Sequence, residues 1–391
     1  MLQRVDKNWQ SIQSFIKPNE AIVEIGRVRE FKSLTQSEGT LFGFTDYTKY
    51  LAIIFKYGEE SPSYVVLGDD YRTEDQHYTR YKNAMLYGVE EKETFEIFWK
   101  PIDEQIGDVE TVRVAPDGIF YKINPNILVM PNDKYVIDKY FVTYLTSTKD
   151  LFRPDAKIFN KKSYLFGNPS FNPDGVDDRL NLTKLPGSES EISQIGSILN
   201  AGWNVKTYLR MDANELRIRS AYNPTVLHIA THGFFGDRYN FIASNSPINS
   251  PLFKSGIYLT GASVTFSRFM DGIATLPEND GILTAYEAMN LDLSRTQLVV
   301  LSACESGLGD IENGEGVYGL QRAFMVAGAR NIITSLAKVD DKATSELMVL
   351  FYEKFRETDD VGESLKYAQL KLRETYSDPK VWGAFILTGN G

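Results

Sequence analysis

Short apolar runs alternate with helix-like segments through residues 161–391. The runs at 226–230 and 298–303 are apolar at nearly every position, a pattern typical of strands buried on both faces of a parallel sheet. Further strands are predicted at 163–167 and 331–336, and helices are predicted at 188–199, 317–329 and 343–356. This alternation predicts an α/β fold in which helices cover a mostly parallel central sheet.

Residues 1–160 carry strand-like runs that are each closed by turn residues. These runs lie at 21–25, 51–55 and 64–68, and a helical stretch near 94–106 and a strand at 111–114 follow them. Asparagine, proline, glycine and aspartate are frequent in 168–187, a composition typical of a surface loop. We expect two domains: residues 1–160 form a non-catalytic scaffold containing a sheet, and residues 161–391 carry the chemistry.

Two helix starts carry the capping-box pattern. Ser188 with Glu191, and Thr284 with Glu287, have the spacing at which a hydroxyl and a carboxyl group satisfy the free amides of a first turn. The first pair predicts a helix that runs from about residue 188 to 199, and the second predicts a short helix.

Cys304 and His232 each follow a predicted buried strand, and Cys304 is the only cysteine of the chain. In open α/β sheets, chemistry gathers beyond the carboxyl ends of the strands, so the two residues are a candidate nucleophile and base. The backbone N–H groups of Gly233 and Cys304 are candidates for holding the oxyanion. Taken singly, a cysteine is more often a small buried hydrophobe and a histidine a structural residue, but their matched positions favour a catalytic pair.

His228 and His232 are four residues apart, which on a strand places them about 13 Å apart and excludes a shared metal ion. His228 is therefore expected in the core or just behind the site. No other cysteine and histidine spacing resembles a zinc site, and no metal is expected. The segment Gly309–Gly316 resembles no phosphate-binding loop, so no nucleotide or other cofactor is expected. The segment is either a solvated loop or a mobile substrate-binding or activation loop.

Composition narrows the range of partners. The net charge of -10, without a cluster of lysine and arginine, argues against nucleic acid as a partner. No apolar stretch approaches the ~18 residues that would span a bilayer, and no signal peptide is apparent at the start of the sequence. One cysteine allows no internal disulfide, so we expect a soluble protein in the reducing cytoplasm.

Three carboxylates near the strand ends are candidates for substrate binding: Asp340, Asp341 and Glu305. Asp340 and Asp341 also precede a predicted helix, where either could cap the helix N-terminus. We expect capping and substrate contact to be compatible roles.

Several motifs together resemble the CHAT family of caspase-like cysteine peptidases, over almost the whole chain. The strongest are His232–Gly233 after one apolar strand and Ser302–Cys304 after another. The others that resemble the family are Pro116–Gly118, Gly167–Pro169, Leu185–Pro186, Leu227–Gly233, Asp280–Ala285, Val299–Gly309, Gly314–Val317, Ser335–Leu336, Val339–Asp341 and Trp382–Phe385.

The resemblance implies a caspase-like three-layer sandwich, preceded by a pseudoprotease-like subdomain, and a cysteine endopeptidase with a His/Cys dyad. It also implies a protein substrate, control by a regulatory protein or a helical-repeat partner, and a role in bacterial defence or signalling. The segment around Asp341 resembles the part of separase whose aspartate receives an arginine, which predicts cleavage after basic residues. Two positions depart from the family: Ala337 replaces a tryptophan and Ser306 a threonine. The alternative is a catalytically silent binding module.

Overall fold

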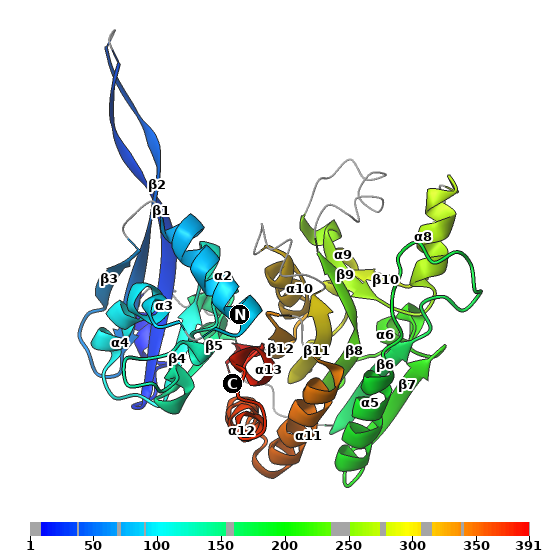
Figure 1. Ribbon diagram of the computed structural model, residues 1–391. Helices are drawn as coiled ribbons and strands as arrows, with labels where there is room; N and C mark the ends of the chain where they lie inside the picture. Colours follow the sequence, from blue (N-terminus) through cyan, green and yellow to red (C-terminus); the bar gives the residue numbers. More distant parts are fainter. Residues whose placement is uncertain are drawn as a thin grey trace, which may run out of the picture. The chain divides into compact units, whose positions relative to one another are not determined.

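A computed structural model gives the structure of the protein (Figure 1). It describes residues 9–36, 39–68, 72–89, 91–153, 160–235, 251–273, 279–305, 315–337 and 340–390. The chain divides into two compact units, one ending at Arg153 and the other running from Pro154 to Gly389, with Asn390 grouped with the first.

The second unit is built on a mostly parallel sheet. Strands β7 (Asn204–Arg210), β6 (Lys162–Pro169), β8 (Val226–Phe235), β11 (Leu298–Glu305) and β12 (Asn331–Ser335) lie in this order and are parallel, and β13 (Phe385–Gly389) pairs with β12 antiparallel. The far end of β8 pairs antiparallel with β9 (Ser255–Tyr258), which pairs with β10 (Ile282–Thr284). The predicted mostly parallel α/β sheet is confirmed.

Helices cover both faces of this sheet. Alternate side chains of the strands, among them Leu227 and Val299, pack with Ile218 and Phe324 in one large apolar cluster. That face carries α6 (Glu215–Arg219), α9 (Ala285–Ala288) and α10 (Glu315–Val326). The opposite face carries α5 (Pro186–Leu199) and α11 (Asp341–Thr358), and α12 (Val361–Arg373) packs on α11. The described residues of this unit also form α8 (Ala262–Met270), α13 (Pro379–Trp382) and the 3-10 turn η7 (Pro251–Phe253). The result is the predicted three-layer arrangement.

The first unit contains a mixed sheet in the order β5 (Phe141–Tyr144), β4 (Thr111–Ala115), β1 (Glu20–Gln36), β2 (Gly39–Lys56) and β3 (Ser63–Leu67). Strands β1 and β2 are much longer than the predicted runs and extend beyond the sheet as a two-stranded ribbon (Figure 1). In the described part of this unit the helices are α1 (Trp9–Gln13), α2 (Tyr78–Tyr87), α3 (Glu93–Phe98) and α4 (Lys100–Ile106), with short helical turns at Thr73–His77, Gly118–Lys122, Pro125–Ile127, Val136–Asp138 and Thr148–Phe152.

One of the two predicted capping boxes is wrong. Helix α5 begins at Pro186, because proline is already set to the helical φ angle at the first position of a helix. Ser188 therefore lies inside the first turn, where its hydroxyl donates to the Leu185 carbonyl. The second capping box is confirmed: Thr284 and Glu287 each accept from the backbone amide of the other.

Candidate active site

His232 lies near the end of β8, and its ring is held by the segment that precedes α5. Its Nε2 lies 2.8 Å from the backbone carbonyl oxygen of Thr183, and the ring of Phe171 packs beside it with centroids 5.3 Å apart. A carbonyl oxygen only accepts hydrogen bonds, so we infer that Nε2 carries a hydrogen. In the neutral ring, Nδ1 is then the nitrogen with basic character.

Cys304 occupies the position of β11 that is directly in register with His232 of the neighbouring parallel strand. Glu305, the next residue, is in register with Gly233. The sheet therefore brings together the backbones of His232, Gly233 and Cys304, which the sequence placed at two separate strand ends. The side chains of Cys304 and Glu305 lie outside the described part of the chain, as does most of the segment Gly309–Gly316.

The motif Gly167–Pro169 ties the end of β6 to the first turn of α5. A Cβ atom on Gly167 would lie 2.6 Å from Cγ1 of Ile192, so only glycine permits this close packing. Asn168 has a left-handed backbone conformation with a φ of 45°, and its backbone N–H donates to the Ser188 hydroxyl at 2.8 Å. These contacts fix where α5 begins, and with it the position of Thr183 three residues before the helix.

The N-terminus of α11 lies beside that of α5. Asp340 caps α11, since its Oδ1 accepts from the backbone amides of Lys342 and Ala343 at 2.9 and 3.1 Å. Asp341 is the first residue of the helix, and a Cβ atom on Gly187 would lie 2.8 Å from the Cβ of Asp341. Of the two roles considered for this pair, the structure assigns capping to Asp340.

Asp341 is electrostatically linked to the candidate base. Partial burial raises the pKa of its carboxyl group above the ordinary value, and repulsion from Asp340 and Glu191 adds to this, whereas attraction to His232 opposes it. The carboxyl group thus lies within the electrostatic reach of the histidine ring. The substrate-binding role predicted for Asp340, Asp341 and Glu305 stays a prediction.

A buried polar network behind His232 was missed by sequence reasoning. Nε2 of His228 lies 2.8 Å from Oε1 of Glu191, and Nδ1 lies 3.0 Å from the hydroxyl of Tyr352. The interpretation of His228 as a core residue is confirmed, because its side chain is fully buried. A signal was present: Glu191 shares the inward face of α5 with Ser188 and Ile195, where an apolar residue is expected.

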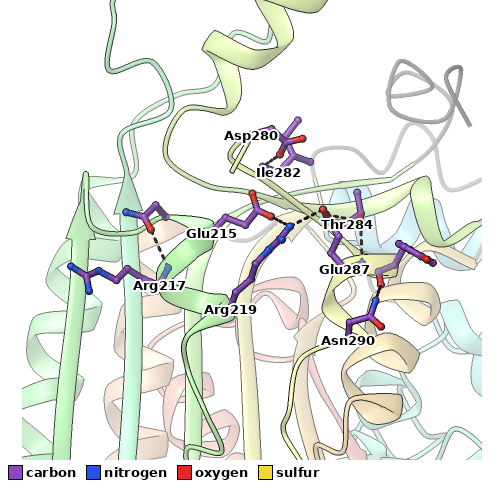
Figure 2. A network of polar contacts seen from close by, with 10 residues as sticks. Glu215, Arg217, Arg219, Asp280, Ile282, Thr284, Glu287 and Asn290 are labelled. Carbon is purple, nitrogen blue, oxygen red and sulfur yellow. Dashed lines mark hydrogen bonds and ion pairs between the residues drawn. The ribbon is translucent and has the colours of Figure 1, made fainter. Parts of the chain in front are cut away.

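A second polar cluster joins α6 to the start of β10 and to α9 (Figure 2). The guanidinium of Arg219 contacts the carboxyl groups of Glu215 and, at 3.0 Å, Glu287. Burial, and then repulsion from neighbouring carboxylates, raises the pKa of Glu215 to about 7. Burial likewise raises the pKa of Asp280 to about 7. Within the described residues, neither this cluster nor any other group of acidic, histidine or cysteine side chains could hold a metal ion.

No helix in the described ranges is long and apolar enough to cross a membrane.

Curated relatives and solved structures resemble the chain over parts of its length. Tetratricopeptide repeat protein 28 of Mus musculus and of Homo sapiens are 26% and 25% identical to it over 238 residues, 58% of this chain and 9% of each relative. The chain thus matches about a tenth of the length of these relatives.

Among solved structures, the Arg specific cysteine proteinase gingipain R is 12% identical with a TM-score of 0.44, covering 75% of this chain and 68% of that one. A Saccharomyces cerevisiae separase-securin complex is 11% identical with a TM-score of 0.42, covering 72% and 15%. The CHAT domain family matches residues 92–390, more than half of the chain. The chain therefore belongs to the CHAT domain family.

Proposed function

We propose that the protein is a cysteine endopeptidase in which His232 is the base and Cys304 the nucleophile. The observation that carries the proposal is the register of β8 and β11, which sets these two residues opposite each other at the carboxyl ends of adjacent parallel strands. The hydrogen bond from His232 Nε2 to the Thr183 carbonyl supports it, because a neutral ring that carries its hydrogen on Nε2 has its basic nitrogen at Nδ1. Catalysis is assigned to residues 161–391, and residues 1–160 act as a scaffold.

The proposed reaction is acyl transfer. Nδ1 of His232 takes the thiol proton, the thiolate attacks the scissile carbonyl, and the imidazolium returns the proton to the leaving amine. Water then hydrolyses the thioester with the same histidine as base. The backbone N–H groups of Gly233 and Cys304 are the proposed oxyanion donors. The adjoining N-termini of α5 and α11 add positive potential, which favours an anion.

Asp341 is proposed to bind the side chain of a basic residue on the amino side of the cleaved bond. Its carboxyl group is partly buried, stands close enough to His232 to be attracted by it, and is repelled by Asp340 and Glu191. An arriving guanidinium would relieve that repulsion and form a bidentate pair with the carboxylate. This favours arginine over lysine, and both over neutral residues.

The substrate is proposed to be a specific protein, and a regulatory protein or a helical-repeat partner is proposed to control the enzyme. The relatives named for tetratricopeptide repeats support such a partner. A cytoplasmic location and a role in bacterial defence or signalling belong to the same proposal and rest on the family resemblance.

An electrophilic peptide separates this proposal from its alternative, a silent binding module. An acyloxymethyl ketone peptide with arginine next to the reactive group should label Cys304, and His232→Ala should suppress the labelling. Intact-mass spectrometry reports the adduct without ambiguity, since the chain has one cysteine. Tight binding of the peptide without any adduct would instead identify a binding module.

A further inference from the structure

Glu191 contacts both strands that carry the candidate dyad. Its Oε1 lies 2.8 Å from Nε2 of His228 on β8, and its Oε2 accepts a longer hydrogen bond, 3.4 Å, from the Ser302 hydroxyl on β11. His228 precedes His232 by four residues and Ser302 precedes Cys304 by two, about 13 and 7 Å along their strands. One carboxyl group on α5 thus joins the two strands at positions four and two residues before the dyad.

The network continues to α11 through Tyr352. Burial raises the pKa of the Tyr352 hydroxyl well above its usual value, so the hydroxyl keeps its proton and can donate to Nδ1 of His228. Nε2–H of His228 then donates to Glu191. Glu191, His228 and Tyr352 are at most 2% exposed, so α5, β8 and α11 are joined by a fully buried chain of hydrogen bonds.

Stability alone is a poor explanation for this network. Burying a carboxyl group, an imidazole and a phenol carries a desolvation penalty, and well-packed apolar side chains of similar volume are often as stable or more so. A satisfied buried network does, however, fix the relative positions of the elements that it joins. Here those elements are the two strands with the dyad and the helix that follows Thr183, whose carbonyl holds the His232 ring.

We propose that Glu191 is a positioning residue for the dyad, acting together with His228 and Ser302. By anchoring α5 to β8 and β11, its carboxyl group sets the position of Thr183, and through it the orientation of His232 relative to the thiol of Cys304. This inference rests on the proposed function and adds to it the group that holds the base and the nucleophile in alignment.

The single cysteine provides a direct test that needs no substrate. The rate of alkylation of Cys304 by iodoacetamide, followed by intact mass at pH 7.5, reports how well the thiol is activated. Glu191→Gln keeps the shape but replaces one of the two carboxyl oxygens, which contact His228 and Ser302, by an amide nitrogen. We expect alkylation of Cys304 to slow by about tenfold, since small misplacements of catalytic groups have effects of that order or larger. Peptide cleavage should lose kcat with little change in KM.

The matched control is Glu215→Gln, which changes another buried glutamate of the same unit, one whose carboxyl group contacts Arg219 on its own helix. Cys304 of this control variant should be alkylated at the wild-type rate. Ser302→Ala should slow alkylation and Ser302→Thr, which retains a hydroxyl, should restore it. Tyr352→Phe should have a smaller effect of the same sign as Glu191→Gln.

Each result is decisive when thermal melting shows that the variant is folded at the assay temperature. The inference is overturned if the Glu191→Gln protein is folded, its Cys304 is alkylated at the wild-type rate and it cleaves peptide at the wild-type rate. If Glu191→Gln does not fold, equal rates for Ser302→Ala, Ser302→Thr, Tyr352→Phe and wild type overturn it. Failure of the proposed function looks different: His232→Ala would then leave the alkylation rate of Cys304 unchanged.

Discussion

Replacing Glu215 by glutamine is expected to stabilise the protein at alkaline pH and to leave it unchanged at acidic pH. Glu215 is 1% exposed, and its Oε2 has no hydrogen-bond partner within the described part of the chain. Although Arg219 contacts its Oε1, the pKa of Glu215 is still raised to about 7, because burial and the nearby Asp280 and Glu287 outweigh that ion pair. Glutamine mimics the protonated, uncharged acid.

The magnitude follows from proton linkage. The folded chain holds a proton on Glu215 up to about pH 7, whereas the unfolded chain releases it near the ordinary pKa of 4.5. Stability therefore falls as pH rises between these values, and the loss is complete above pH 7. At about 1.4 kcal/mol per pH unit, it amounts to about 3 kcal/mol. Glu215→Gln should recover most of this, a rise in melting temperature on the order of 5 °C at pH 8.

Thermal unfolding of wild type and variant at pH 5, 6, 7 and 8 measures this difference. The gap between their melting temperatures should widen with pH through this range. Glu189→Gln is the control of opposite sign, because the Arg210 guanidinium lowers the pKa of Glu189, so its replacement should be neutral or slightly destabilising near pH 7. A Glu215→Gln protein that is less stable than wild type at pH 8, or a gap independent of pH, would refute the reasoning.

Three further predictions concern the candidate site. Cys304→Ala and His232→Ala should each abolish peptide cleavage by the folded protein, and a chelator should not change the activity of the wild type. Cleavage by either variant at the wild-type rate would argue against the dyad. Gly187→Ala places a Cβ atom 2.8 Å from that of Asp341, so it should lower the free energy of unfolding by about 1–3 kcal/mol and reduce cleavage. An unchanged melting temperature would contradict the close packing of these two residues. Asp341→Asn should lose the preference for arginine and lysine in a peptide library, and an unchanged preference would remove Asp341 as the residue that binds the basic side chain.

The strands that bear the candidate dyad could be predicted from the sequence because burial on both faces makes them continuously apolar. The 226–230 and 298–303 runs lie within β8 and β11. Because these two strands pair in parallel, His232 and Cys304 near their carboxyl ends are opposite each other in the register. Strands such as β7 were missed: its residues 204–210 include exposed positions, so no apolar run marks them.

The groups that surround His232 could not be predicted in the same way. Thr183 acts through its backbone carbonyl, which carries no information about residue type. Glu191 matched a capping-box pattern, and local spacing could not show that Pro186 starts the helix earlier and turns that carboxyl group inward to His228. Long-range contacts of this kind depend on how α5 packs on the sheet.

The most direct measurement for the central claim is a comparison of newly formed protein N-termini by mass spectrometry. Cell lysates are incubated with wild-type protein, with Cys304→Ala and with His232→Ala, and new N-termini are labelled and sequenced. We predict a small set of cleavage sites, enriched in a preceding arginine or lysine, that appear with wild type and are absent with both variants. Identical sets of N-termini for wild type and Cys304→Ala, with both proteins folded, would contradict it.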